Sequence, residues 1–177
     1  MATKISLKIG DITKIAIDVI VNAANSSLMG GGGVDGAIHK AGGSTLLAEC
    51  QEIVKTIGSC KTGEAVITNA GNLPCRKVIH TVGPIWHGGI QNEAALLASC
   101  YKNSLDLAVK YHLTTIAFPN ISTGIYHYAK KEAAHLTINA VSNFLNEHTE
   151  AIKEVVFVCF DEDNLNHYYQ VLAMQKI

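Results

Sequence analysis

The sequence carries almost no excess charge of either sign. Its 177 residues include 14 Lys and Arg against 15 Asp and Glu, a formal net charge of −1. The longest basic cluster is Lys130–Lys131, so we expect no broad nucleic-acid-binding surface. The N-terminal segment lacks the charged-then-apolar pattern of a signal peptide, and no apolar run reaches the length of a transmembrane helix. These absences predict that the protein is not associated with a membrane.

Cysteine and histidine lack the spacings of common disulfide and metal motifs. The five cysteines are odd in number and widely separated, with no CxxC pair, which indicates reduced thiols and predicts a cytoplasmic location. The eight histidines are scattered, and none lies in an HExxH or mixed His/Cys arrangement. We therefore expect no metal centre and no cofactor.

Apolar residues are abundant, and their periodicity predicts both strands and helices. Hydrophobic residues make up 48% of the chain and charged residues 16%, which favours one compact domain over residues 1–177. Strands are predicted at Ile5–Ile9, Val19–Val21, Glu64–Thr68, Lys77–Thr81, Thr115–Phe118 and Val155–Phe160. Helices are predicted at Val34–Ala41, Thr45–Thr56, Asn92–Tyr111, Lys130–Asn146 and Asn164–Met174. This alternation predicts an α/β fold with a sheet between two layers of helices.

Two of the predicted strands lie close in sequence and are joined by a turn-rich segment. "NAGNLPCR" connects Glu64–Thr68 with Lys77–Thr81, which favours antiparallel or neighbouring strands and hence a mixed sheet. In such sheets ligands bind beyond the C-terminal ends of the strands. Three loops occupy that position: the one that contains Gly30–Gly33, "NISTGIYHYAK" after Thr115–Phe118, and "DEDN" after the last strand.

The glycine run Gly30–Gly33 precedes a predicted helix with Asp35 in its first turn. The stretch Gly31–Gly36 satisfies GxGxxG, which leaves a dinucleotide-binding turn open. That turn would begin at once after the first strand, whereas here several residues separate Val21 from Gly30. Bare amides before a helix N-terminus also form an anion site, and we favour this interpretation. The segment Asn120–Tyr126 repeats the pattern, and two such loops at one sheet edge fit a diphosphate.

Five motifs, in order along the chain, resemble a known family. They are "GDIT" (Gly10–Thr13), "DVIVNAAN" (Asp18–Asn25), "GGGGVDGAIH" (Gly30–His39), "HTVGP" (His80–Pro84) and "FPNISTGIY" (Phe118–Tyr126). Together they resemble the macrodomains, and more narrowly the MacroD-type O-acetyl-ADP-ribose deacetylases of bacteria. The resemblance covers nearly the whole chain and implies a three-layer α/β/α fold with a central mixed sheet that binds ADP-ribose.

The resemblance also implies a role for individual residues. Asp11 would bind the adenine amino group, with Ile12 beside the base and Phe160 packed on it. Asn25 would hold the proximal ribose, and Asp35 would be the catalytic carboxylate. The phosphates and proximal ribose would be bound by two further groups of residues: Gly33 with Val34, and Ser122, Thr123, Gly124, Ile125 and Tyr126.

The sequence departs from the family after Tyr126. The family usually continues Gly-Tyr-Pro, where this chain has His127-Tyr128-Ala129. Histidine in place of glycine is expected to stiffen the loop, and loss of proline to loosen the start of the next helix. We expect His127 to face solvent, with a role in proton transfer as the alternative.

The function implied is hydrolysis of esters of ADP-ribose. Substrates would be O-acetyl-ADP-ribose and proteins that carry mono-ADP-ribose on acidic side chains. A carboxylate beside the sugar can orient and deprotonate the attacking water, and a neutral amide can hold the sugar without competing for the proton. One alternative is a non-catalytic ADP-ribose reader, which needs no carboxylate at the position of Asp35. A nucleotide-dependent oxidoreductase is a more distant alternative.

Overall fold

A computed structural model describes residues 2–175 of the chain. In chain order the elements are β1 (Lys4–Ile9), the 3-10 helix η1 (Ile12–Lys14), β2 (Val19–Ala23), α1 (Gly33–Gly42), α2 (Ser44–Ile57), β3 (Ala65–Asn69), β4 (Lys77–Thr81), α3 (Glu93–Lys110), β5 (Thr115–Phe118), α4 (Lys130–Glu147), β6 (Glu154–Cys159) and α5 (Glu162–Gln175). Every predicted strand and helix is present, with ends that agree to within two residues. The short helix η1 was not predicted.

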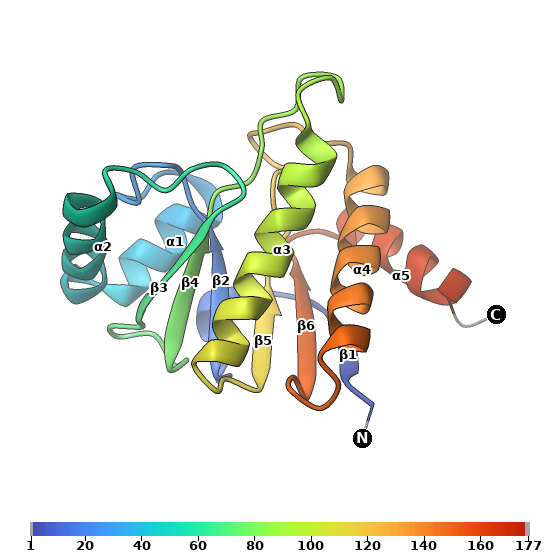
Figure 1. Cartoon of the computed structure of the whole chain (residues 1–177), viewed down its shortest axis with the longest axis horizontal. Coiled ribbons are helices and arrows are strands. Elements are labelled where there is room, and N and C mark those ends of the chain that lie inside the picture. The colour runs from blue at the N-terminus through green and yellow to red at the C-terminus, as the bar shows by residue number, and fades with distance from the viewer. Residues whose placement is uncertain (1, 176–177) are drawn as a thin grey trace.

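The strands form one mixed sheet in the order β1-β6-β5-β2-β4-β3. All neighbouring pairs are parallel except β3 and β4, which are antiparallel, as the turn-rich connection between them predicted. Because the other strands are parallel, the loops that follow β1, β2, β4, β5 and β6 gather at one edge of the sheet (Figure 1). This is the edge at which ligands bind in such folds.

Helices cover both faces of the sheet, which gives the predicted three layers. On one face α3, α4 and α5 pack over a core that includes Val19, Val21 and Ile116, whereas α1 and α2 cover Ile20 and Ala117 on the other (Figure 1). Alternate residues of β2 therefore point into different cores, which explains why this central strand is apolar throughout its first half.

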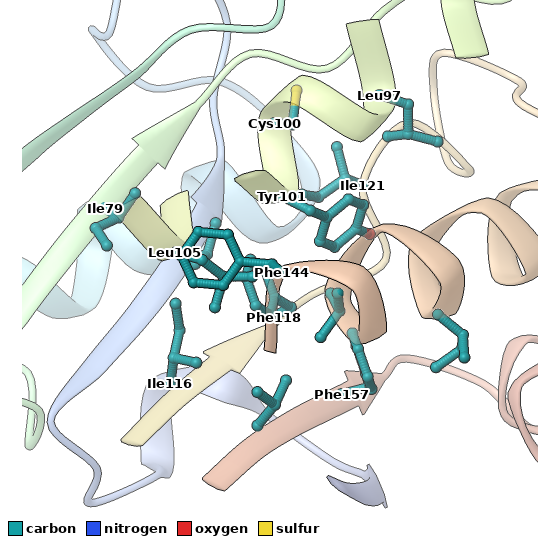
Figure 2. Close-up of a cluster of buried hydrophobic side chains, with 14 of the residues drawn as sticks. Ile79, Leu97, Cys100, Tyr101, Leu105, Ile116, Phe118, Ile121, Phe144 and Phe157 are labelled. Carbon is teal, nitrogen blue, oxygen red and sulfur yellow. The ribbon is translucent and has the colours of Figure 1, made fainter. Parts of the chain in front are cut away.

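Aromatic rings fill the centre of the larger core. Tyr101 of α3 lies against Phe118 of β5 with ring centroids 5.0 Å apart, and Phe118 stacks on Phe157 of β6 at 6.0 Å (Figure 2). Tyr168 of α5 packs on Phe157 in turn, at 5.0 Å. These contacts fix β5 and β6, and with them the loops that follow both strands. Within residues 2–175 no helix is both long and apolar enough to cross a membrane.

Candidate functional site

The glycine run folds Asn25 and Asp35 against the same stretch of backbone. A Cβ placed on Gly31 would lie 3.2 Å from Asp35 Oδ2 and 3.3 Å from Asn25 Nδ2, so both side chains reach this one residue. A Cβ on Gly36 would lie 2.3 Å from the Gly31 carbonyl oxygen, so the loop also lies directly on α1. Glycine suits this position because a Cβ would crowd both polar side chains.

Asn25 is held in place by its own loop. Its Nδ2 donates to the Gly30 carbonyl at 3.0 Å, and its Oδ1 accepts from the Ser27 hydroxyl at 2.6 Å and the Ser27 amide at 3.2 Å. Gly30, with φ of 92°, and Gly33, with φ of 57°, adopt backbone that favours glycine. The chain thus turns from β2 into the N-terminus of α1 while Asn25 stays beside it.

Asp35 lies in the first turn of α1 and is only 5% exposed. Its Oδ1 accepts a hydrogen bond from Asn22 Nδ2 at 2.8 Å and lies 3.5 Å from His39 Nε2. Burial raises the pKa of the Asp35 carboxyl above its ordinary value, and the contacts with Asn22 and His39 offset part of this rise. Asp35 Oδ1 is therefore held by Asn22 and His39, whereas Oδ2 faces Gly31 in the glycine run.

Behind Asp35 lies a chain of buried polar side chains that sequence reasoning missed. Asn22 Nδ2 lies 3.1 Å from His80 Nδ1, and His80 Nε2 lies 3.0 Å from Thr68 Oγ1. Asn22 and His80 are fully buried and stand opposite each other in the register of β2 and β4. Burial lowers the pKa of His80 to about 3, helped by His39, so the ring is neutral at ordinary pH. The sequence signal for these side chains was a polar residue directly after the apolar positions of a strand: Asn22 in β2 and His80 in β4.

The second loop, residues 119–129, presents a row of unused amides. Within the described part of the chain, the N–H groups of Ser122 to Tyr126 donate to no protein acceptor, whereas the amides of His127 and Tyr128 bond back to Gly124 and Ser122. Ser122, with φ of 66°, is buried, and its Oγ has no partner among residues 2–175. Successive free amides of this kind form an anion-binding concavity.

The two loops meet across the site, and a third loop supports them. The Cδ1 atom of Ile125 would lie 3.8 Å from a Cβ on Gly32, so Ile125, 74% exposed, reaches over the glycine run. The half-buried Tyr126 accepts a hydrogen bond from the Trp86 amide at 2.8 Å. The Trp86 ring packs on the Tyr128 ring with centroids 4.7 Å apart, so the loop between β4 and α3 contacts the second loop, residues 119–129.

The two departures from the family pattern, His127 and Ala129, lie at the end of this loop, before α4. His127 is exposed, as predicted, and has φ of 58°, a left-handed conformation that glycine adopts without strain. Ala129 is the N-cap of α4 and has φ of −61°, close to the value that proline requires.

The residues predicted to bind adenine lie at the start of the loops that follow β1 and β6. Asp11 is exposed, and its Oδ1 caps η1 by accepting from the Thr13 amide at 2.9 Å and hydroxyl at 2.6 Å, which leaves Oδ2 for another donor. Ile12, the first residue of η1, is buried in the smaller core with Ile20 and Ile38. Phe160 follows β6 and is 90% exposed, so its ring has a free face. Gly33 and Val34 form the first turn of α1, between this end and Asp35.

One group of side chains has spacing that would suit a metal ion. Ligand atoms of His39, Cys50 and His80 all lie within 4.8 Å of one another. His80 Nε2 is already engaged by Thr68, and burial together with the Asp35 charge raises the pKa of Cys50 to about 11, which keeps the thiol protonated. Hydrogen bonds account for the contacts of His80, whereas His39 Nε2 is buried without a hydrogen-bond partner among residues 2–175. A protonated thiol is a poor metal ligand, so the three side chains do not form a favourable metal site.

Comparison with known proteins gives a consistent result. Residues 21–137 match the family model of the macro domain. A macro domain-containing protein of Listeria monocytogenes is 56% identical over 175 residues, 98% of this chain and 99% of that protein. An O-acetyl-ADP-ribose deacetylase of Escherichia coli is 53% identical over 175 residues, 99% of this chain and 98% of that protein.

Solved structures agree in fold. The Oceanobacillus iheyensis macrodomain with ADP superposes with a TM-score of 0.90 at 45% identity, covering 97% of this chain and 92% of that one. The Trypanosoma brucei macrodomain in complex with ADP-ribose has a TM-score of 0.87 at 40% identity, covering 95% of this chain and 68% of that one. By sequence, family model and fold, the chain belongs to the macro domain family.

Proposed function

We propose that the protein binds ADP-ribose and hydrolyses its O-acyl esters, with O-acetyl-ADP-ribose as substrate. The observation that carries the proposal is the buried carboxylate of Asp35. Its Oδ2 and Asn25 Nδ2 both approach Gly31, and the unused amides of Ser122 to Tyr126 lie on the neighbouring loop. Relatives that are 53% identical are named O-acetyl-ADP-ribose deacetylase, and related structures hold ADP or ADP-ribose.

The ligand is proposed to lie along the loop edge of the sheet. Asp11 Oδ2 accepts from the adenine amino group, Ile12 lies beside the base, and Phe160 packs on it. The amides of Ser122, Thr123, Gly124, Ile125 and Tyr126 bind the diphosphate, together with Gly33 and Val34 at the N-terminus of α1, whose dipole favours negative charge. In this proposal the proximal ribose lies at Gly31, between Asn25 and Asp35.

Asp35 is proposed as the general base. Its raised pKa makes the carboxylate a better proton acceptor, which suits abstraction of a proton from water. The water oxygen forms a bond with the acyl carbon, and its proton goes to Asp35 Oδ2. When the tetrahedral intermediate collapses, the bond from the acyl carbon to the ribose oxygen breaks and the proton passes from Asp35 to that oxygen. Acetic acid and ADP-ribose leave, and the acid releases its remaining proton to solvent as acetate. Asn25 holds the ribose during these steps without taking the proton.

The same chemistry extends the proposal to protein substrates. An Asp or Glu side chain linked to ADP-ribose is also an ester on the ribose, so the same attack would release the protein. We further propose a cytoplasmic location, supported by five cysteines that are all free thiols, and one domain over residues 1–177.

Burial of the carboxylate favours an enzyme over a reader. A reader gains nothing from a desolvated negative charge near a diphosphate, because like charges repel and burial of charge is costly. The test is release of acetate from O-acetyl-ADP-ribose by the wild-type protein in excess chelator, with calorimetric binding of ADP-ribose alongside. Metal-independent turnover is expected. Tight binding without turnover would establish the reader instead.

A further inference from the structure

We propose that His80 is a positioning residue for ester hydrolysis and acts through Asn22 to hold Asp35 in its working orientation. The inference rests on the proposed function, because it assigns the support of the proposed base. His80 itself touches no ligand position, since it is fully buried behind Asn22.

Three side chains from three different elements form the chain. Asp35 comes from α1, Asn22 from β2 and His80 from β4, and the register of the two parallel strands sets Asn22 directly opposite His80. A single atom, Asn22 Nδ2, is shared: it lies 2.8 Å from Asp35 Oδ1 and 3.1 Å from His80 Nδ1. Thr68 of β3 closes the far end at His80 Nε2.

The charge on Asp35 fixes the direction of every hydrogen bond. An ionised carboxylate only accepts, so Asn22 must turn its NH₂ group towards it. The same NH₂ group faces His80 Nδ1, which must therefore be the unprotonated ring nitrogen. The ring proton then lies on Nε2 and is donated to Thr68 Oγ1. A protonated imidazole would set an N–H against the NH₂ group of Asn22, and complete burial of the ring disfavours that state.

The opposite orientation of Asn22 would disrupt the site. It would bring Asn22 Oδ1 against the carboxylate of Asp35, with two acceptors in contact. In the observed orientation Asn22 Oδ1 is buried and accepts no hydrogen bond within residues 2–175. In exchange, Asn22 Nδ2 donates two hydrogen bonds, one to Asp35 Oδ1 and one to His80 Nδ1. His80 Nδ1 is the acceptor that makes this orientation preferable.

Two variants of the same residue separate positioning from packing. In His80→Asn the side-chain amide oxygen can take the place of Nδ1 and accept from Asn22. In His80→Gln the amide reaches the place of Nε2 and Thr68, but no hydrogen-bond acceptor lies at the place of Nδ1, because the atom one bond beyond Cγ is the amide carbon. Cys50→Ala is the matched control, since Cys50 Sγ approaches the ring only at Nε2, at 3.8 Å.

The first measurement is single-turnover deacetylation across pH, with ADP-ribose affinity measured alongside. We expect His80→Gln to lower turnover by about tenfold to hundredfold, since misplacing a catalytic group by about 1 Å can cost about 10²-fold. Affinity should stay near that of the wild type. The Asn22 hydrogen bond lowers the pKa of Asp35, so its loss should shift the acid limb of the profile to higher pH. His39 and Cys50, the other titratable groups near Asp35, are unchanged in this variant.

The controls decide the interpretation. His80→Asn should recover most of the rate and return the acid limb to its wild-type position, and Cys50→Ala should leave the limb where it is. The proposal is overturned if His80→Gln leaves the limb unmoved, or if His80→Asn or Cys50→Ala shifts it equally. Asp35→Ala is measured in parallel: wild-type turnover in that variant would refute Asp35 as the base, which is the failure of the proposed function rather than of His80.

A second measurement needs no variant to be active. Nitrogen-detected NMR of ¹⁵N-histidine-labelled wild-type protein, with the His80 signal assigned from its loss in His80→Asn or His80→Gln, reports the tautomer directly. We expect a neutral ring with its proton on Nε2 between pH 5 and 8. A proton on Nδ1, or a cationic ring in that range, would overturn the proposal even if both variants failed to fold.

Discussion

Replacing His127 by glycine should stabilise the protein. His127 is exposed and has φ of 58°, while its amide donates to the Gly124 carbonyl at 3.0 Å, a bond that glycine keeps. Left-handed backbone costs a residue with a side chain about 1–2 kcal/mol. Glycine loses about 0.4–1 kcal/mol through the greater freedom of the unfolded chain. The difference is a gain of up to about 1.6 kcal/mol with a middle value of about 0.8 kcal/mol, which corresponds to about 2–3 °C in Tm for a chain of this size.

His112 offers a matched control far from the site. It is also exposed, has φ of 56°, and follows α3, where its amide donates to the Val109 carbonyl at 3.1 Å. His112→Gly should therefore raise the free energy of unfolding, measured by urea denaturation, by a similar amount. If His127→Gly destabilises while His112→Gly stabilises, the His127 side chain makes a contact that the strain argument omits. The pH profile of turnover should be unchanged in both variants. Loss of one limb of that profile in His127→Gly alone would show proton transfer by His127.

Two further predictions concern acid stability and binding. Stability should fall as the pH drops from about 6.5, the unfolded-state value for histidine, towards the lowered His80 pKa of about 3, because the unfolded chain binds a proton that the native ring refuses. In His80→Asn the free energy of unfolding, measured by urea denaturation at each pH, should depend less on pH in this range. An equal pH dependence in the variant and the wild type would contradict a lowered His80 pKa. Asp11→Ala should weaken ADP-ribose binding by about 1–3 kcal/mol if a buried hydrogen bond is lost. Asp11→Asn, which keeps an oxygen for capping Thr13, separates that loss from disruption of η1; unchanged calorimetric affinity in both would remove Asp11 from the site.

The fold could be predicted because the periodicities are strong and local. The run from Val19 to Val21 is apolar on both faces, as a central parallel strand requires, and helix α3 carries a clear apolar stripe. The short connection between β3 and β4 favoured antiparallel or neighbouring strands, and the two strands are antiparallel neighbours. Helix η1 was missed because its signal is a single cap, Asp11 over Thr13, rather than a repeating pattern.

The proximity of Asn25 and Asp35 could be predicted because the two residues flank one short glycine run. Asn25 precedes that run and Asp35 lies in the first turn of α1 after it, and the side chains of both approach Gly31. The support behind Asp35 depends on the register of β2 with β4, which periodicity does not determine. Asn22 and His80 could still have been noticed, because each is a polar residue directly after buried apolar strand positions and would need a partner.

The role of Asp35 is tested most directly by single-turnover hydrolysis of O-acetyl-ADP-ribose. Asp35→Ala should lower turnover by about 10²–10⁴, the usual contribution of a general base, while ADP-ribose affinity stays the same or improves as a buried negative charge is removed. Asn25→Ala, the matched comparison, should lower both turnover and affinity, since holding the ribose serves the ground and transition states alike. Near-wild-type turnover by Asp35→Ala would contradict the account and leave the carboxylate with a structural role only.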